Sequence, residues 1–375
     1  LRNRKARIRR RLQPRNWANQ SKPMLDATNI HYEMAAKSQA QSCGGIGAIH
    51  LMVQRLGLPQ EIDQHLKLLK VHLPYHESDH VLNIAYNCLV GGQRLEDMER
   101  LRQDESYLNG LGAQRTPDPT TAGDFTRRFA EQDILTLQEA INRTRQKVWQ
   151  QQARGFLREA FIDVDGTLAP THGECKEDIG LSYQGTWGYA PLVVSLANTK
   201  ETLYTLNRPG NKNSQSDSVP WIDRAFELIQ PHAKQITLRG DTAFSHCSQL
   251  DRWNAAGHHF ILGLQAHPTA VQLAEALAES AWSPLERLPK YEIRTEPRQK
   301  PRRVKEAIVV QNGYRNICLE GESLAEISYQ PHECGQEYRL IILRKNLSVK
   351  KGEQMLVDDI RYFFYLTNKP QEERD

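Results

Sequence analysis

The chain has 375 residues, of which 39% are hydrophobic, and its formal net charge is +4. This length exceeds what one small core organises, so we expect two or three domains. No apolar run approaches the length needed to span a bilayer, and no apolar segment follows the basic N-terminus as a secretory signal requires. The six cysteines are scattered without a CxxC pair, which favours reduced thiols in a cytoplasm and speaks against a structural zinc site.

The positive charge is concentrated near the N-terminus. The first fifteen residues, LRNRKARIRRRLQPR, carry eight basic side chains and no acid. Such a run is typical of an arm that contacts nucleic acid, and equally of a solvated tail. Residues 45–155 then show helical spacing of apolar residues, with Arg127 and Arg128 on an expected helix at 122–130. These basic faces favour DNA binding, with a plain solvated surface as the alternative.

From Phe156 the pattern changes to strands. We expect a first strand that ends at DVDGT, further strands over 189–198, 203–207, 235–239 and 259–264, and helices over 221–229 and 245–256. Three strands in a meander, followed by helix, strand, helix and strand, indicate a mixed sheet with helices packed on it.

The motif DVDGT at the end of the first strand carries the clearest chemical signal. Asp163 and Asp165 are two residues apart, so on a strand both carboxylates point to the same face. Gly166 and Thr167 then allow a tight turn. Two acids beside such a turn indicate a divalent-metal site, and a turn capped by one acid is the alternative.

Asp241 repeats this arrangement, because it ends a buried strand and precedes a turn into a helix. If that strand lies beside the first, Asp165 and Asp241 sit side by side. Two neighbouring carboxylates repel each other unless a cation joins them. Mg²⁺ suits oxygen ligands, and a pair of such ions supports in-line attack on a phosphodiester.

Beyond His267 the sequence pattern changes again. Residues 290–305 are strongly basic and include Arg302 and Arg303. We expect a helix over 270–281 and strands over 291–295, 307–311, 317–319, 338–344 and 361–367.

Several motifs together resemble the DDE transposases of bacterial insertion sequences. They are YHESDHVL, the DPTT loop, DVDGT with PTHG, PLVVSLANT, LNRPGN, LRGDTAFS and RYFFYLTN, and they cover nearly the whole chain. The resemblance implies an α/β fold with a ribonuclease-H-like mixed-sheet core. It implies a flexible basic arm (1–44), a helical DNA-binding domain (45–155), the catalytic core (156–267), a β-rich insertion (268–360) and a return strand of the core (361–375).

Carried over residue by residue, the first catalytic acid of this family falls on Asp165 and the second on Asp241. Asp163 is the alternative for the first position, or a partner that supports the metal-binding acid from behind. The resemblance implies that the acids hold two Mg²⁺ ions, for which Mn²⁺ substitutes, and that these activate water and then a DNA 3′-hydroxyl. The implied reaction is metal-dependent cleavage and strand transfer at terminal inverted repeats.

The implied partners are double-stranded DNA, as the terminal repeats and the target, and a second copy of the chain in a synaptic complex. The protein is expected to be DNA-associated in a bacterial cytoplasm. The residues that we expect to contact DNA are Arg127, Arg128, Arg208, Arg302 and Arg303.

The third acid of the family, a glutamate on a helix after the return strand, has no clear counterpart. Glu372 and Glu373 follow RYFFYLTN too closely to lie in the middle of that helix. We therefore expect that the chain is cut before the catalytic helix, binds metal weakly and is inactive or nearly so.

Two other functions fit parts of the sequence. A haloacid-dehalogenase-type phosphatase also places DxDGT after an apolar strand, with Asp163 as nucleophile and Asp165 as general acid and base. The other alternative is a non-catalytic, DNA-binding transposase remnant. Near DVDGT, His172 and Glu174 are candidates for positioning metal or substrate. The aromatic residues Tyr183 and Trp187 are candidates for stacking on a base, or for the core.

Overall fold

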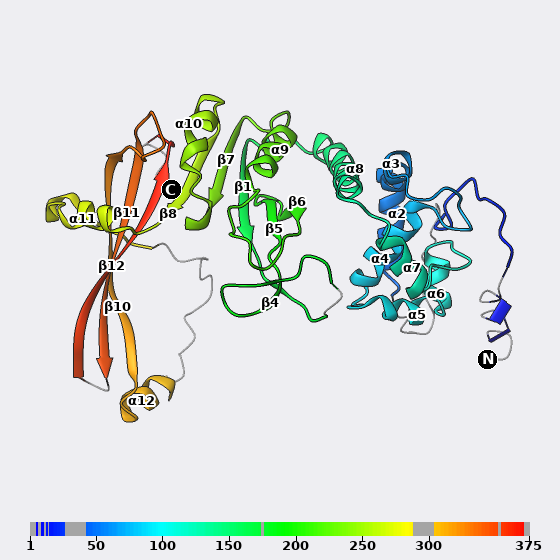
Figure 1. Ribbon diagram of the computed structural model, residues 1–375, viewed down its shortest axis with the longest axis horizontal. Coiled ribbons are helices and arrows are strands. Elements are labelled where there is room, and N and C mark those ends of the chain that lie inside the picture. The colour runs from blue at the N-terminus through cyan, green and yellow to red at the C-terminus, as the bar shows by residue number, and fades with distance from the viewer. Residues whose placement is uncertain are drawn as a thin grey trace. The chain divides into compact units, whose positions relative to one another are not determined.

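A computed structural model describes residues 5–6, 9–10, 13, 15–26, 43–173, 176–287, 304–351 and 354–370. The chain divides into two compact units, Leu1–Phe156 and Leu157–Asp375 (Figure 1). None of the helices in the described ranges has the length and apolar character needed to cross a membrane.

The first unit is helical, as the sequence predicts. Gly57 lies in the left-handed region at φ +74°, which ends one helix and starts the next, with Pro59 in its first turn. Asp104 and Asp118 cap later helices by accepting hydrogen bonds from backbone N–H groups of the first turn. The helices are α2 (Ile46–Leu56), α3 (Leu58–His65), α4 (Glu77–Leu89), α5 (Met98–Leu101), α6 (Glu105–Gly110), α7 (Pro119–Thr126) and α8 (Glu131–Gln150).

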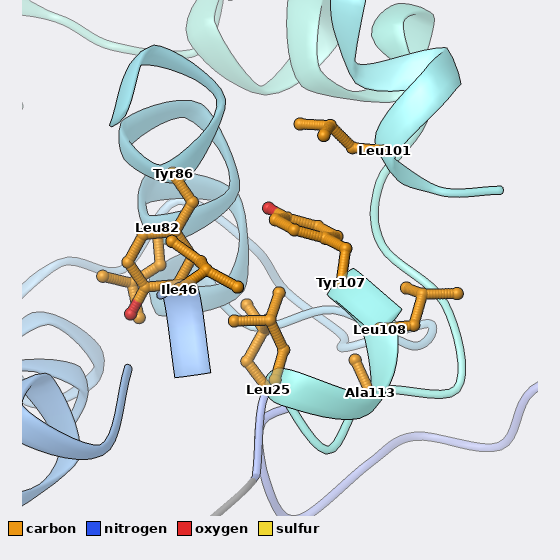
Figure 2. Close-up of a cluster of buried hydrophobic side chains, with 9 residues drawn as sticks. Leu25, Ile46, Leu82, Tyr86, Leu101, Tyr107, Leu108 and Ala113 are labelled. Carbon is orange, nitrogen blue, oxygen red and sulfur yellow. The ribbon is translucent and has the colours of Figure 1, made fainter. Parts of the chain in front are cut away.

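The core of the helical unit includes a side chain from the segment that precedes the helices. Leu25 is buried in a cluster with Tyr86 of α4 and Tyr107 of α6 (Figure 2). The Asp79 carboxylate accepts hydrogen bonds of 2.8 Å from the backbone N–H groups of Met24 and Leu25. A buried acid of α4 therefore fastens this segment to the core.

The second unit is built on a nine-stranded sheet in the order β6-β5-β1-β7-β8-β12-β11-β10-β9. β1, β5 and β6 form the expected antiparallel meander, and β7 and β8 run parallel to β1. This arrangement confirms the ribonuclease-H-like mixed sheet. The strands of the core are β1 (Glu159–Gly166), β5 (Leu192–Leu196), β6 (Glu201–Leu206), β7 (Gln235–Gly240) and β8 (His259–Leu264).

The crossover helices α9 (Val219–Ile229) and α10 (Cys247–Ala255) join β6 to β7 and β7 to β8. Asp223 of α9 holds α10, because its carboxylate accepts hydrogen bonds from Arg252 at 3.0 Å and from the Trp253 indole at 2.9 Å. Apolar residues at every second position of β1 are buried, and α9 contacts β1, β5 and β6. The helices thus define the apolar face of the core.

The alternate residues of β1 form a half-exposed polar face. Glu159 pairs with Lys369 at 2.5 Å, and Asp163 pairs with Arg239 of β7 at 2.7 Å. Both cations lie over the ring of Phe161, at 5.5 and 5.1 Å from its centroid. The Asp163–Arg239 pair joins two neighbouring strands, and the Glu159–Lys369 pair ties a residue near the C-terminus to the start of β1.

Beyond β8 the chain forms a long antiparallel ribbon (Figure 1). Its strands are β9 (Ser283–Pro284), β10 (Arg315–Tyr329), β11 (Tyr338–Lys351) and β12 (Gln354–Thr367), and β12 returns to pair with β8. The ribbon strands extend well past the bounds expected from the sequence. The turn between β10 and β11 docks on α10, where Asp251 accepts hydrogen bonds from the Tyr338 hydroxyl and the Gly335 backbone N–H.

Two expectations for this region are wrong, and one is not covered. The strand expected at 307–311 lies within a helix, α12 (Val304–Gln311), because a short apolar run fits either structure. The helix expected at 270–281 ends earlier, as α11 (Pro268–Glu275) followed by a 3₁₀ turn, Glu279–Ala281. The strand expected at 291–295 lies outside the described residues.

Candidate catalytic site

The two acids assigned from sequence lie at neighbouring strand ends. β1 and β7 are parallel, and their register pairs Val164 with Gly240. The next residue on each strand is Asp165 or Asp241, and both side chains are exposed. The structure therefore brings Asp165 of DVDGT and Asp241 of LRGDT to the same end of two neighbouring strands.

Each acid uses one oxygen to shape its own turn. Asp165 Oδ1 accepts a hydrogen bond of 2.8 Å from the Gly166 N–H. Asp241 Oδ1 accepts one of 2.9 Å from the Ala243 N–H and so caps the 3₁₀ turn Thr242–Phe244. The predicted alternative of a capped turn is thus also present. The Oδ2 atom of each acid takes no part in these two hydrogen bonds.

Asp163 is engaged differently from Asp165. Both of its oxygens accept hydrogen bonds from the Arg239 guanidinium, at 2.7 and 2.9 Å. This hydrogen-bonded pairing raises the pKa of Arg239. The charge of Asp163 is therefore balanced by an arginine of β7, and this pair joins the two strands.

A glycine of β8 makes room for the Asp241 turn. A Cβ atom at Gly263 would lie 2.7 Å from the Thr242 nitrogen and 3.0 Å from the Asp241 carbonyl carbon, which is closer than real Cβ atoms approach. The backbone after Asp241 therefore folds directly over β8. Sequence reasoning missed this residue, although a glycine inside the apolar strand HFILGL signals close backbone approach.

A cavity of about 480 Å³ opens beside Asp241. Its lining includes Gly166 and Thr167 after β1, Tyr183, and Lys212 of the polar loop at 207–218. The Lys212 ammonium lies 3.9 Å from a carboxylate oxygen of Asp217, and the side chain is about half exposed. The wall of the cavity thus contains both Asp241, from the end of a strand, and Lys212, from a loop.

Arg208 does not occupy the exposed position that the sequence predicts for a phosphate contact. Its side chain is 3% exposed, and its guanidinium donates to the carbonyl oxygens of Ala190, Ser214 and Ser216 at 2.6–3.0 Å. Burial lowers the pKa of Arg208. Its Nη2 is also buried, with no partner among the described residues. Arg208 therefore shapes the polar loop from within, and because it also lines the cavity beside Asp241, a contact with a DNA phosphate stays a prediction.

A small sheet stands next to this loop, formed by β2 (Ala169–Pro170), β4 (Trp187–Tyr189) and β3 (Gly180–Leu181). Its backbone packs directly on the loop, because a Cβ at Gly210 would lie 2.5 Å from the Gly180 carbonyl oxygen. Tyr183 is 89% exposed and Trp187 is 53% exposed. Both aromatic residues are therefore surface residues and not part of the core.

The other predicted site residues are more scattered. His172 lines a separate cavity of about 350 Å³ with Trp187, while Glu174 lies outside the described residues. Arg127 and Arg128 are exposed at the end of α7, where Arg127 pairs with Asp124 at 2.5 Å. Residues outside the described ranges also include Arg302, Arg303, Glu372, Glu373 and most of the basic arm.

The match to a known sequence family agrees with the motifs. The sequence family described as transposase DDE domain group 1 matches residues 25–310. No curated protein matches the chain. Solved structures similar to it include the piggyBac transposase synaptic complex with hairpin DNA, with a TM-score of 0.37 and 10% identity over 86% of this chain. The chain spans 61% of the length of that structure. Because the family match covers most of its length, the chain belongs to the group 1 family of transposase DDE domains.

Proposed function

We propose that the chain is the DNA-binding and catalytic part of a bacterial insertion-sequence transposase that cuts DNA at the terminal inverted repeats of its element. The family match supports transposition. The observation that carries the proposal is the placement of Asp165 and Asp241 at adjacent, exposed ends of parallel strands. The family match speaks against the haloacid-dehalogenase alternative. Its nucleophile would be Asp163, and both carboxylate oxygens of this residue already accept hydrogen bonds from Arg239.

The two acids suit a divalent cation. Both carboxylates are exposed, and among the described residues neither forms an ion pair with a cationic side chain. We propose that they hold Mg²⁺, in a pair of ions for which Mn²⁺ substitutes. Bound there, the ions would lower the pKa of water or of a DNA 3′-hydroxyl and stabilise the charge of the phosphate.

The surrounding residues position this site and its substrate. The Asp163–Arg239 pair fixes the register of β1 against β7, and Gly263 lets the Asp241 turn lie close to β8. Lys212 joins Arg208 as a proposed phosphate contact, since both line the cavity beside Asp241 and Lys212 is about half exposed. Arg127 and Arg128 remain proposed contacts of the helical unit with the DNA ends, and we propose that two copies assemble on paired ends.

The test uses protein expressed from the complete gene and DNA carrying both flanks of that gene. We expect nicking that requires Mg²⁺ or Mn²⁺ and stops with a chelator. Asp165→Asn and Asp241→Asn should each abolish nicking and leave binding of the ends in gel-shift assays largely intact. Glu227→Gln, which changes an exposed acid of α9, is the matched control and should behave like the wild type.

Four results would contradict the proposal. Nicking that survives either aspartate substitution would remove the acids from the reaction, and loss of end binding in both variants would make them structural. Turnover of p-nitrophenyl phosphate that disappears with Asp163→Asn would favour the phosphatase. End binding without nicking in either metal would identify a DNA-binding remnant.

A further inference from the structure

The loop between α3 and α4 in the helical unit gathers three potential metal ligands. One ligand atom each from His72, His76 and Glu77 lies within 4.8 Å of the other two. Neither histidine belongs to the catalytic site, which lies in the other unit. His76 and Glu77 belong to the YHESDHVL motif and His72 precedes it by three residues, and the transposase function does not use the chemistry of this motif.

The spacing of the ligand atoms suits zinc. Zinc binds imidazole nitrogen and carboxylate oxygen at about 2.0–2.2 Å, so two ligand atoms of a tetrahedral site lie roughly 3.3 Å apart. His72 Nε2 and Glu77 Oε2 are 3.2 Å apart. The His72 and His76 rings are stacked, with centroids 3.7 Å apart and planes inclined by 10°. One ligand atom from each of the three side chains therefore lies close enough to the other two to share one ion.

The partners of these side chains resemble the outer partners of known metal ligands. Glu77 Oε1 accepts hydrogen bonds from the backbone N–H groups of Leu68 and Leu69, at 3.0 and 2.9 Å, which leaves Oε2 facing His72. His76 Nε2 is 3.0 Å from the carbonyl oxygen of Gln20. A hydrogen bond from Nε2 to a carbonyl fixes the tautomer and leaves Nδ1, which lies 3.9 Å from Asp63 Oδ2, as the nitrogen that can bind a metal.

The burial of Glu77 and His76 favours the binding of a cation. Glu77 is 1% exposed and His76 is 8% exposed. Burying a carboxylate is unfavourable unless a positive charge or a full set of hydrogen bonds compensates it. Glu77 has no arginine or lysine partner among the described residues, and its contact with His72 is the one ion-pair contact it makes there.

We propose that His72, His76 and Glu77 bind one zinc ion, which joins the loop at 66–76 to the first turn of α4. Three protein ligands leave one coordination position for water. The same turn of α4 contains Asp79, which holds Met24 and Leu25 in the core. Zinc binding therefore stabilises the helical unit that carries the proposed DNA contacts. Cysteine spacing gave no sign of this site, since it has no cysteine ligand.

The test measures zinc and not activity. The full chain carries Asp165→Asn and Asp241→Asn, so that the catalytic acids do not contribute metal. After exposure to zinc sulfate and removal of unbound metal, we expect about one zinc per chain and a higher thermal midpoint than in chelator. His72→Gln and His76→Gln each remove a proposed ligand, so each should weaken zinc binding by more than the roughly 10- to 100-fold loss that follows removal of an outer partner.

The matched control is His65→Gln. His65 also faces a glutamate, Glu61, at 3.6 Å, but no second histidine joins this pair among the described residues. Its zinc content should equal that of the parent. Zinc binding that is unchanged in His72→Gln, or absent from the parent protein, would overturn the proposal. If His76→Gln fails to fold, His72→Gln decides, because the His72 side chain is 25% exposed and tolerates the change.

Discussion

His80 lies flat against Phe125 inside the helical unit, with ring centroids 4.3 Å apart. Burial lowers the pKa of this imidazole from 6.5 to about 4. Its Nδ1 is buried without a hydrogen-bond partner among the described residues. The protein therefore keeps a neutral histidine where a charged one would be costly.

This burial predicts that stability falls with acid. As the pH drops below 6.5, the unfolded chain binds a proton at His80, whereas the folded chain does so only near pH 4. Stability due to this group is therefore lost between pH 6.5 and pH 4. At pH 5 the loss amounts to about 2 kcal/mol.

The variant His80→Phe should remove that loss, because phenylalanine keeps the ring and has no proton to bind. Urea unfolding from pH 8 to pH 4 should show a smaller decline for the variant than for the wild type. His65→Gln, on the exposed end of α3, should follow the wild type. Parallel curves for His80→Phe and the wild type would show that His80 does not titrate in this way.

Single residues also show where sequence reasoning reaches its limit. The adjacency of Asp165 and Asp241 was predictable, because each motif follows an apolar strand and parallel strands align such ends. The burial of Arg208 was not, since it depends on where the carbonyl groups of the loop turn. His72 and Glu77 meet only through the fold of the loop between them, which no periodicity encodes.

At the scale of elements, the contact of the Asp241 turn with β8 sets the position of one proposed catalytic acid. Gly263→Ala should push the turn away, since its Cβ would meet the Thr242 nitrogen. We expect the variant to lose stability by about 1–3 kcal/mol and to lose nicking while it retains end binding. Gly321→Ala is the control, because a Cβ there has open space. Wild-type nicking by Gly263→Ala would contradict the positioning role.

The docking of the ribbon turn on α10 gives a second prediction for elements. Asp251→Ala removes the acceptor of the Tyr338 hydroxyl and the Gly335 N–H, which are hydrogen bonds to a charged group. Hydrogen exchange should become faster at 330–338 and stay unchanged in β1 and β7. Asp359→Ala, in the exposed part of β12, should leave the turn protected. Unchanged exchange in Asp251→Ala would mean that other contacts hold the turn.

The elements themselves were unequally predictable. β8 appears with the bounds that its apolar run HFILGL suggests, because a buried strand must be apolar on both faces. β10 is far longer than its apolar centre, since RNICLEGESLAEISY is stabilised by pairing with β11 and not by its own pattern. The apolar run within α12 fits a strand as well as a helix, because the sequence there carries no length or capping signal.

At the scale of the whole molecule, the boundary between the two units lies in an exposed stretch. Residues 151–156 are exposed, and Gly155 has φ +84°, whereas Leu157 is buried. Brief trypsin treatment should therefore cut after Arg154 and leave a stable fragment that begins at Gly155. N-terminal sequencing and mass spectrometry identify that fragment, and Arg154→Gln should prevent it. Cleavage within β1 or α8 before this site would contradict the division.

The return of β12 to β8 has a consequence for how the protein is made. Leu264 pairs with Phe364, which follows it by 100 residues. At a synthesis rate of roughly 5–20 residues per second, the ribosome needs on the order of 5–20 s to deliver that partner. Until then the edge of β8, an apolar strand, has no neighbour on that side, and such edges recruit strands of other chains. The speed at which the ribosome translates the residues between β8 and β12, and the capture of the nascent chain by chaperones, thus influence what fraction of chains completes the sheet.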